Sequence, residues 1–208
     1  TKGQFSATAE VGLNLKKHGV NQYMPIDICM EAIASNATFV ARSFAGDPKQ
    51  VKELLKAAMA HKGISMLDII SPCVTFNNQE NAYHSYTWGK DHEAPLHEIS
   101  FIPARDEIIL PDDFEEGTVR EVTMHDGSSV ILKKLEHDYD PANKFQALQK
   151  LEEAQRNNWM LTGLIYLDTT KPALHEKYNL VSTPLNRLTE KELRPGPETI
   201  QHINDMMF

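Results

Sequence analysis

Cysteine is scarce in this sequence: only Cys29 and Cys73 occur, and their surroundings differ. Two such residues do not make the disulfide framework of a small secreted protein. Long hydrophobic runs are missing too, because the stretches Ile64–Ile70 and Met160–Leu167 are far too short to cross a bilayer. No apolar signal-peptide segment opens the chain. We therefore expect a cytoplasmic protein that does not enter a membrane.

An excess of positive charge is also lacking. The 21 Lys and Arg residues are outnumbered by 29 Asp and Glu residues, and the net charge of −8 speaks against nucleic acid or anionic lipid as a partner. What is present is ordinary globular composition, with 41% hydrophobic and 24% charged residues. The 208 residues suffice for one full-sized domain with a substantial core.

Helical and strand patterns alternate in the first third of the chain. Apolar residues recur at helical spacing over Ile26–Ala34, and the β-rich run Ala37–Arg42 follows. A second helix is predicted to start at Asp47–Gln50, whose first residue suits the N-cap and whose last occupies the capping-box position. Ile64–Ile70 then has the pattern of a buried strand, ended by Ser71-Pro72-Cys73. This rhythm predicts an α/β fold with a parallel sheet and crossover helices.

The rest of the chain is less regular. Val74–Pro111 has no clear period, which predicts a long functional or partner-covering loop. Asp126-Gly127 lies between two β-rich runs and predicts a hairpin with a type I′ turn. Leu161–Leu167 is predicted to be a final strand, and from Lys171 onward repeated prolines indicate a tail.

Another helix is predicted between the hairpin and the final strand. Its start is expected at Asp140-Pro141. The residues at helical spacing that should line its apolar face are Phe145, Leu148, Leu151 and Ala154.

Cys73 is the first candidate for chemistry, because it follows the predicted strand at its carboxyl end, where α/β sheets place ligands. A thiolate there could bind iron or zinc or act as a nucleophile. A lone cysteine without a CxxC partner is, however, more often a small buried hydrophobe. Cys29, inside an apolar helical pattern, is predicted to be such a packed thiol. Lys2, next to Gly3, offers a cation for a carboxylate or phosphate, or is simply a solvated terminal residue.

Several common catalytic motifs are missing. The nine histidines form no HxH or HExxH arrangement, and no GxSxG, Walker or GxGxxG motif occurs. Asp112-Asp113 and Asp168-Thr169-Thr170 supply carboxylates, but the sequence pairs neither with a base or a metal. From the residues alone, the sequence predicts an α/β domain with Cys73 as its candidate site.

Three segments, taken together, indicate a more specific function. Thr1–Thr8 (TKGQFSAT), Phe39–Pro48 (FVARSFAGDP) and Ser71–Asn77 (SPCVTFN) resemble, in order and spacing, the β subunit of 2-oxoacid:ferredoxin oxidoreductases, most closely the 2-oxoglutarate type. The predicted hairpin and Leu161–Tyr166 fit this family as well. The resemblance covers most of the chain and is weakest after Lys171.

The resemblance implies a fold and a division of the chain. The fold would be an α/β, parallel-sheet thiamine-diphosphate-binding domain, truncated at its N-terminus, with an added β-hairpin and an extended C-terminal tail. Residues 1–111 would form the C-terminal part of that domain with the cluster-ligand loop. Residues 112–208 would hold the hairpin, the helix and the C-terminal extension without forming an independent domain.

The resemblance also implies an activity. The chain would be a fragment of the β subunit of an oxidoreductase that decarboxylates 2-oxoglutarate to succinyl-CoA and reduces ferredoxin. The full complex would contain thiamine diphosphate, Mg²⁺ and a 4Fe–4S cluster, of which the thiamine supplies the carbanion chemistry. The implied partners are the α subunit, ferredoxin, the 2-oxoacid and coenzyme A. The alternatives are an enzyme for pyruvate or for a broad range of 2-oxoacids, and a non-catalytic, truncated interaction domain.

Individual residues take roles from the same resemblance. Cys73 matches the family's remote fourth cluster ligand. Lys2 matches a loop next to the thiazolium, where a cation could pair with the distal carboxylate that pyruvate lacks, and Thr1, Gly3 and Gln4 would line the cofactor pocket. The family's other cluster cysteines and its GDG…DN magnesium-diphosphate motif lie upstream of this loop and are absent from the sequence. We therefore expect a fragment that binds neither cofactor alone and is inactive by itself.

Overall fold

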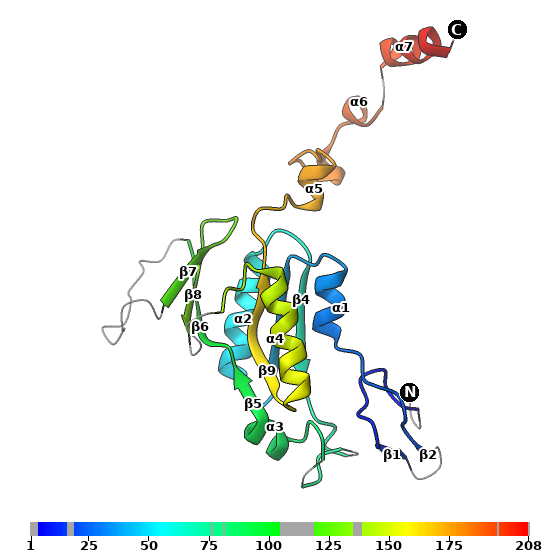
Figure 1. Cartoon of the computed structure of the whole chain (residues 1–208). Helices are drawn as coiled ribbons and strands as arrows, with labels where there is room; N and C mark the ends of the chain where they lie inside the picture. Colours follow the sequence, from blue (N-terminus) through cyan, green and yellow to red (C-terminus); the bar gives the residue numbers. More distant parts are fainter. Residues whose placement is uncertain are drawn as a thin grey trace. The chain divides into compact units, whose positions relative to one another are not determined.

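The computed structural model describes residues 4–15, 19–75, 77–80, 82–104, 119–134, 139–194 and 196–207. Contacts divide the chain into two compact units, Thr1–Pro172 and Ala173–Phe208 (Figure 1). The boundary predicted between residues 111 and 112 falls outside the described residues. No described helix has the length and apolar character to cross a membrane.

The first unit is built around a four-stranded sheet in the order β4-β3-β9-β5. Its strands are β3 (Phe39–Phe44), β4 (Ser65–Ile70), β5 (Glu93–Pro95) and β9 (Met160–Leu167). Strands β3 and β4 are parallel and are joined through helix α2 (Pro48–Ala60), as the sequence predicts. β9 instead runs antiparallel to β3, and β5 is parallel to β9. The sheet is therefore mixed rather than all parallel.

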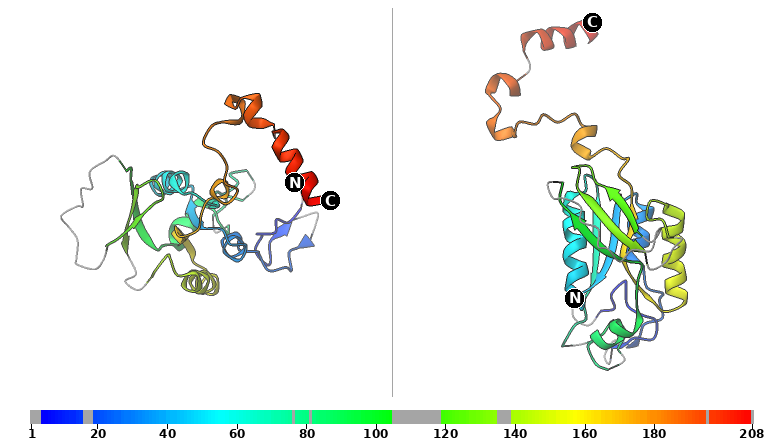
Figure 2. Two further views of the ribbon diagram at one scale, coloured as in Figure 1. Left: turned by 90° about the horizontal axis from the view of Figure 1, so that it is seen from above. Right: turned by 90° about the vertical axis from the view of Figure 1, so that its left-hand side faces the viewer.

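Helices cover both faces of this sheet. On one face, α1 (Ile28–Ala34) and α4 (Lys144–Arg156) pack against β3 and β9 through one apolar cluster. On the other face, α2 shares a second cluster with a three-stranded sheet. Its strand order is β6 (His97–Ile102), β8 (Ser129–Lys134), β7 (Val119–Thr123). Figure 2 shows α2 and α4 on opposite sides of the central sheet. The core thus consists of two apolar layers with β3 and β9, both fully buried, between them.

Local signals explain where α1 and α2 begin. The Asp27 carboxylate accepts hydrogen bonds from the backbone N–H groups of Cys29 and Met30, and Asp47 accepts one from the N–H of Gln50. The predicted capping box at Gln50 is wrong. Its side chain turns inward, where its Oε1 accepts a hydrogen bond from the buried hydroxyl of Ser43 at 2.8 Å.

The segment predicted to be one long loop contains regular structure. Residues 86–102 form α3 (Tyr86–His92), β5 and β6 (His97–Ile102). Ser85 caps α3 by accepting a hydrogen bond from the N–H of Trp88, and alternate residues at the start of β6 are buried. The elements are too short to give a sustained period, which is why the sequence did not predict them.

The predicted hairpin is confirmed, but its turn type is wrong. β7 (Val119–Thr123) and β8 (Ser129–Lys134) are antiparallel, with Thr123 opposite Ser129. In the connecting turn only Gly127 has a positive φ, of 82°, whereas a type I′ turn needs two such residues. Asp126 stabilises the turn by accepting hydrogen bonds from the N–H and hydroxyl of Ser128.

Helix α4 begins at Lys144, later than predicted, because Asn143 rather than Asp140 caps it. The Asn143 side chain accepts hydrogen bonds from the N–H groups of Phe145 and Gln146. Phe145 is also 83% exposed, contrary to the predicted apolar face. The buried face of α4 consists of Ala147, Leu151 and Ala154.

The remaining elements are short or peripheral. β1 (Asn14–Leu15) and β2 (Gly19–Val20) form a small hairpin near the N-terminus. The second unit contains helices α5 (Leu174–Lys177), η1 (Leu185–Arg187), α6 (Glu190–Leu193) and α7 (Pro197–Met207), none of which contributes a buried residue.

Candidate functional site

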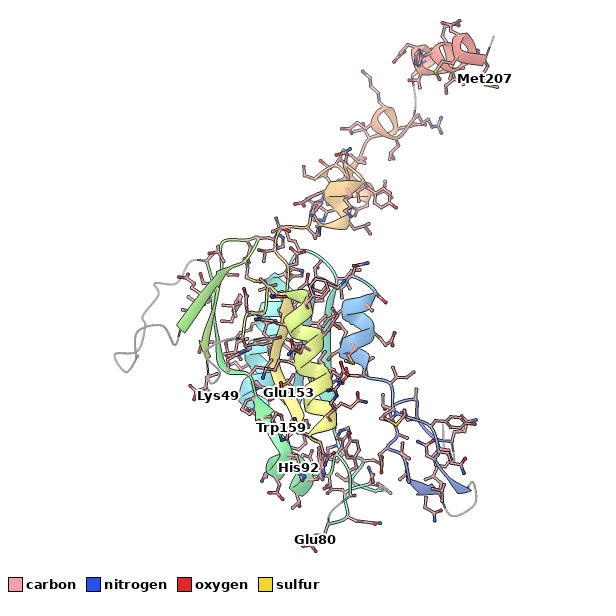
Figure 3. The ribbon with its side chains drawn as sticks, in the orientation of Figure 1. Lys49, Glu80, His92, Glu153, Trp159 and Met207 are labelled. Atoms are coloured by element: carbon pink, nitrogen blue, oxygen red, sulfur yellow. The ribbon has the colours of Figure 1, made fainter. Side chains whose placement is uncertain are left out.

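A cavity of about 250 Å³ lies at the carboxyl ends of the parallel strands β3 and β4. This is the edge of an α/β sheet at which ligands bind. The N-terminal loop, α1, the segment after β4 and the C-terminal end of α4 supply its walls. Figure 3 shows Trp159, which lines the cavity, just beyond α4. The polar or aromatic lining residues are Thr8, Asp27, Arg42, Asp68, Ser71, Tyr83, His84, Gln155 and Trp159.

Arg42 links two carboxylates in the cavity wall. Its Nη2 donates to Asp27 Oδ1 and its Nε donates to Asp68 Oδ2, both at 2.8 Å. Asp68 lies beside Arg42 because the two residues are partners in the β3–β4 register. Asp27 has two roles, since the same Oδ1 caps α1. This ion-paired group thereby holds α1 against the two strands, with side chains no more than 15% exposed.

Cys29 lies beside this group and is fully buried. Burial raises the pKa of its thiol to about 12, so the residue stays protonated at neutral pH. The prediction of a packed thiol in α1 is confirmed. A protonated, inaccessible thiol is unsuited to metal binding or nucleophilic attack.

Aromatic rings form another wall. Tyr83 and His84 are stacked with centroids 3.8 Å apart, and Trp88 lies 4.7 Å from Tyr83. His84 has a positive φ of 62°, which is uncommon for residues other than glycine. Burial, together with the charge of Arg42, lowers the pKa of His84 to about 4. The cavity therefore presents a neutral imidazole at pH 7.

The residues predicted to carry chemistry have different positions. Thr1, Lys2 and Gly3 lie outside the described residues, as do Asp112 and Asp113. Gln4 is described and exposed, and it lines a second hollow beside the N-terminal loop. Asp168 accepts hydrogen bonds from the N–H and hydroxyl of Thr170, which form a local turn rather than a catalytic pair.

Cys73 is exposed and carries a free thiol. It follows Ser71, a residue of the cavity wall, by way of Pro72. Among the described residues, no group of three or more His, Cys, Asp or Glu side chains could hold a metal ion. Cys73 can therefore supply one accessible metal ligand, and other residues would have to supply the rest of the metal site.

The polar residues that shape this end of the sheet were not predicted from the sequence. Arg42 and Asp68 occur singly within apolar strand patterns, and only the β3–β4 register brings them together. A second chain of side chains connects the buried Gln50 to the buried Thr162 at 3.4 Å and Thr162 to the half-buried Glu93 at 2.9 Å. Burial raises the pKa of the Glu93 carboxyl. A charged residue inside an otherwise apolar strand was the available signal, because such a residue needs a buried partner.

Comparison with known proteins shows a similarity over part of the chain. Residues 131–183 match the family model for the C-terminal part of the β subunit of pyruvate ferredoxin oxidoreductase. This part of the chain is therefore similar to the C-terminal part of the β subunits of 2-oxoacid:ferredoxin oxidoreductases.

Two known proteins are similar to part of the chain. The 2-oxoacid:ferredoxin oxidoreductase subunit beta of Saccharolobus solfataricus is 44% identical over 82 residues, which are 38% of this chain and 26% of the relative. The 2-oxoglutarate oxidoreductase subunit KorB of Mycobacterium tuberculosis is 35% identical over 79 residues, which are 38% of this chain and 21% of that protein. The matches thus span about a quarter of the length of these relatives.

A solved structure supports the fold. The chain superposes on the 2-oxoglutarate:ferredoxin oxidoreductase of Magnetococcus marinus, solved with 2-oxoglutarate, coenzyme A and succinyl-CoA bound, with a TM-score of 0.55. The superposition covers 89% of this chain and 51% of that chain at 23% sequence identity. The expected α/β class with a parallel strand pair is therefore confirmed, and the likeness extends to the fold alone.

The residues present do not by themselves complete the cofactor sites expected of this β-subunit family. A 4Fe–4S cluster takes four thiolates, whereas the sequence has two cysteines, of which Cys29 is buried in the core. The cavity wall contains two carboxylates and one guanidinium. The net negative charge of this group would repel a diphosphate. This chain can contribute parts of such sites but not either site as a whole.

Proposed function

We propose that this chain is part of the β subunit of a 2-oxoacid:ferredoxin oxidoreductase that acts on 2-oxoglutarate. In the complete enzyme, with its α subunit, the 2-oxoacid loses CO₂, its acyl group passes to coenzyme A and two electrons pass to ferredoxin. Thiamine diphosphate supplies the chemistry of decarboxylation when it is bound. The chain's own residues would position the substrate and contribute one ligand to the iron–sulfur cluster.

One observation carries this proposal: the three segments that resemble the family meet at one cavity. Thr8 comes from the first segment, Arg42 from the second and Ser71 from the third, and all three line the same hollow. They are far apart in the sequence, so only the fold assembles them. A set of motifs retained around one cavity favours a ligand-handling role over a purely structural one.

Lys2 is proposed to recognise the substrate. 2-Oxoglutarate differs from pyruvate by a distal carboxylate, and a lysine ammonium next to the reacting carbon could pair with it. Thr1, Gly3 and Gln4 are neighbours of Lys2 in the sequence and, by the same resemblance, would contact the cofactor. Removing one partner of a desolvated ion pair costs about 3–5 kcal/mol.

Pyruvate is the second candidate substrate. It is favoured by the description of the matched family model, whereas the KorB relative is named for 2-oxoglutarate. The net charge of the ion-paired group is negative, so the cavity wall itself offers no surplus cation for a second carboxylate. Substrate choice would then depend on Lys2.

The test uses the complete β subunit assembled with its α subunit. Ferredoxin reduction is measured with 2-oxoglutarate and with pyruvate, for the wild type, for Lys2→Gly and for Lys171→Gly, an exposed lysine as matched control. We expect Lys2→Gly to lower kcat/KM for 2-oxoglutarate roughly 100-fold or more while sparing pyruvate. An unchanged 2-oxoglutarate rate would refute the role of Lys2. Absence of activity with every 2-oxoacid would instead favour a non-catalytic interaction domain.

A further inference from the structure

His61 and His125 meet where helix α2 ends and the β7–β8 hairpin turns. His61 is the C-cap of α2 and is 7% exposed. His125 belongs to the turn, and the two ring centroids are 5.2 Å apart with planes inclined at 61°. Met124, next to His125, lies in the same apolar cluster as Leu54 of α2. The two imidazoles therefore lie at the junction between the hairpin and the helix.

Each ring has one bonded and one unbonded nitrogen. His61 Nε2 lies 2.7 Å from the hydroxyl oxygen of Thr38, and His125 Nδ1 accepts a hydrogen bond from the backbone N–H of Lys62 at 3.3 Å. His61 Nδ1 and His125 Nε2 are the buried side-chain nitrogen or oxygen atoms without a hydrogen-bond partner in the described part of the chain. Such unsatisfied atoms are rare in native proteins and call for an explanation.

The bonded nitrogens determine what the unbonded ones offer. Because Nδ1 of His125 accepts, the neutral ring carries its proton on Nε2, which is then an unused donor. We assign the Thr38 hydroxyl as the donor to the carbonyl of Ile64 at 3.5 Å and as the acceptor from Nε2 of His61 at 2.7 Å. This assignment leaves Nδ1 of His61 as an unused acceptor. One unused donor and one unused acceptor are complementary.

We propose that His61 and His125 form an acid-sensitive contact that holds the β7–β8 turn on the end of α2. When His61 is neutral, the pair has one unused donor and one unused acceptor. When His61 takes up a proton, its Nδ1 becomes a second donor and the pair has no acceptor for either N–H group, so the turn separates from the helix. This proposal does not depend on the proposed function.

The charged groups around the pair do not reverse this direction. Asp168 favours a protonated His61, but its Oδ1 already accepts two hydrogen bonds from Thr170. Asp126 lies in the same turn and is exposed, and Lys62 is within electrostatic range of it. Burial, followed by the charge of His125, lowers the pKa of His61 from 6.5 to about 4. The depressed pKa means that the contact is intact above pH 6.5 and is lost as the pH falls toward 4.

Hydrogen exchange of the full-length protein tests the acid-sensitive contact between His61 and His125. The protection of amides in Met124–Val130 is measured at pH 7.5 and pH 5, corrected for intrinsic exchange rates, with α4 as internal reference. A shift of the His61 pKa from 6.5 to about 4 predicts that the opening equilibrium of the turn rises roughly 30-fold at pH 5. His61→Gln, which retains an amide donor for Thr38, and His125→Gln should both lose this dependence. His202→Gln, an exposed histidine, should keep it.

Two results would overturn the proposal. One is protection of the turn that does not change between pH 7.5 and pH 5, and the other is a pH response in His61→Gln equal to that of the wild type. If a variant fails to fold, an NMR titration of the wild-type rings decides. A His61 ring that titrates at pH 6.5 or above refutes the acid-sensitive contact, whereas a ring that stays neutral to about pH 4–5 supports it.

Discussion

Arg42 is the residue on which the cavity wall depends. Its guanidinium forms ion pairs with both Asp27, at the start of α1, and Asp68 of β4. Arg42→Met should lower the free energy of unfolding by about 3–5 kcal/mol at pH 7, because two buried carboxylates lose their common partner. Chemical denaturation followed by circular dichroism measures this loss.

The matched control for Arg42 is an ion pair on the surface. Arg156→Met breaks the exposed pair with Glu152 on α4 and should cost no more than about 0.5 kcal/mol. The loss in Arg42→Met should also shrink when Asp27 and Asp68 are both changed to Asn, since no unpaired charge then remains. Equal losses in the Arg42 and Arg156 variants would contradict the buried ion-paired group.

At the same scale, the sequence predicted some residues well and others not at all. Cys29 could be predicted to be buried because its apolar neighbours repeat at helical spacing. Gln50 could not be assigned correctly, because its local position suits a capping box and only the fold brings Ser43 within reach. Arg42 was missed for the same reason, since its partners come from other elements. Pairings between distant elements leave no local pattern in a single sequence.

At the scale of elements, His97 of β6 supports an irregularity in β9. The register between β3 and β9 shifts after Val40, and Gly163 of β9 has a φ of 110°. The backbone N–H of Leu164 donates a hydrogen bond to the side-chain Nε2 of His97 at 2.9 Å. A Cβ at Gly163 would lie 3.0 Å from that nitrogen, so the glycine makes room for the ring. One buried imidazole thus joins the hairpin sheet to the central sheet.

This arrangement predicts a pH dependence of stability. Burial lowers the pKa of His97 to about 4 from 6.5, so its contribution is complete above pH 6.5 and is lost as the pH falls through 4. Wild-type protein should lose up to about 3 kcal/mol of unfolding free energy from this group between pH 7 and pH 4. Urea denaturation across this range measures the slope, and His97→Gln should flatten it. Parallel slopes in wild type and His97→Gln would contradict the assignment.

Long elements were predictable and short ones were not. The β3–α2–β4 unit follows from apolar periodicity and from the Asp-Pro helix start, both of which are local. The start of α4 was misplaced because Asp140 and Asn143 are both good caps. Asp140 accepts a hydrogen bond from the N–H of Ala142 before the helix, whereas Asn143 accepts from N–H groups in the first turn of the helix. α3, β5 and β6 lie in one run without a period, although the alternation from His97 to Ser100 was visible. Such elements are stabilised by tertiary contacts, which a local pattern does not contain.

At the scale of the whole molecule, the two cysteines of the chain have opposite environments. Cys29 is buried beside the ion-paired group, and Cys73 is exposed next to the cavity wall. An iron–sulfur ligand must reach its cluster as a thiolate. Cys73 meets the requirement of access, whereas Cys29, with a pKa of about 12, does not. The cluster role of Cys73 is therefore a proposal about how this chain completes a site in a larger assembly.

Substitution of the two cysteines in turn separates that role from simple packing. In the complete β subunit with its α subunit, Cys73→Ser should lower the iron content, abolish the brown absorbance and slow ferredoxin reduction, because one ligand of the cluster is lost. Its exposure means that the fold should be unaffected, so the melting temperature of the metal-free protein should not change. Cys29→Ser should do the reverse, since a hydroxyl in the apolar core destabilises the protein but touches no metal. Iron analysis with calorimetry on the same samples decides between them, and a full iron content in Cys73→Ser would exclude it as a ligand.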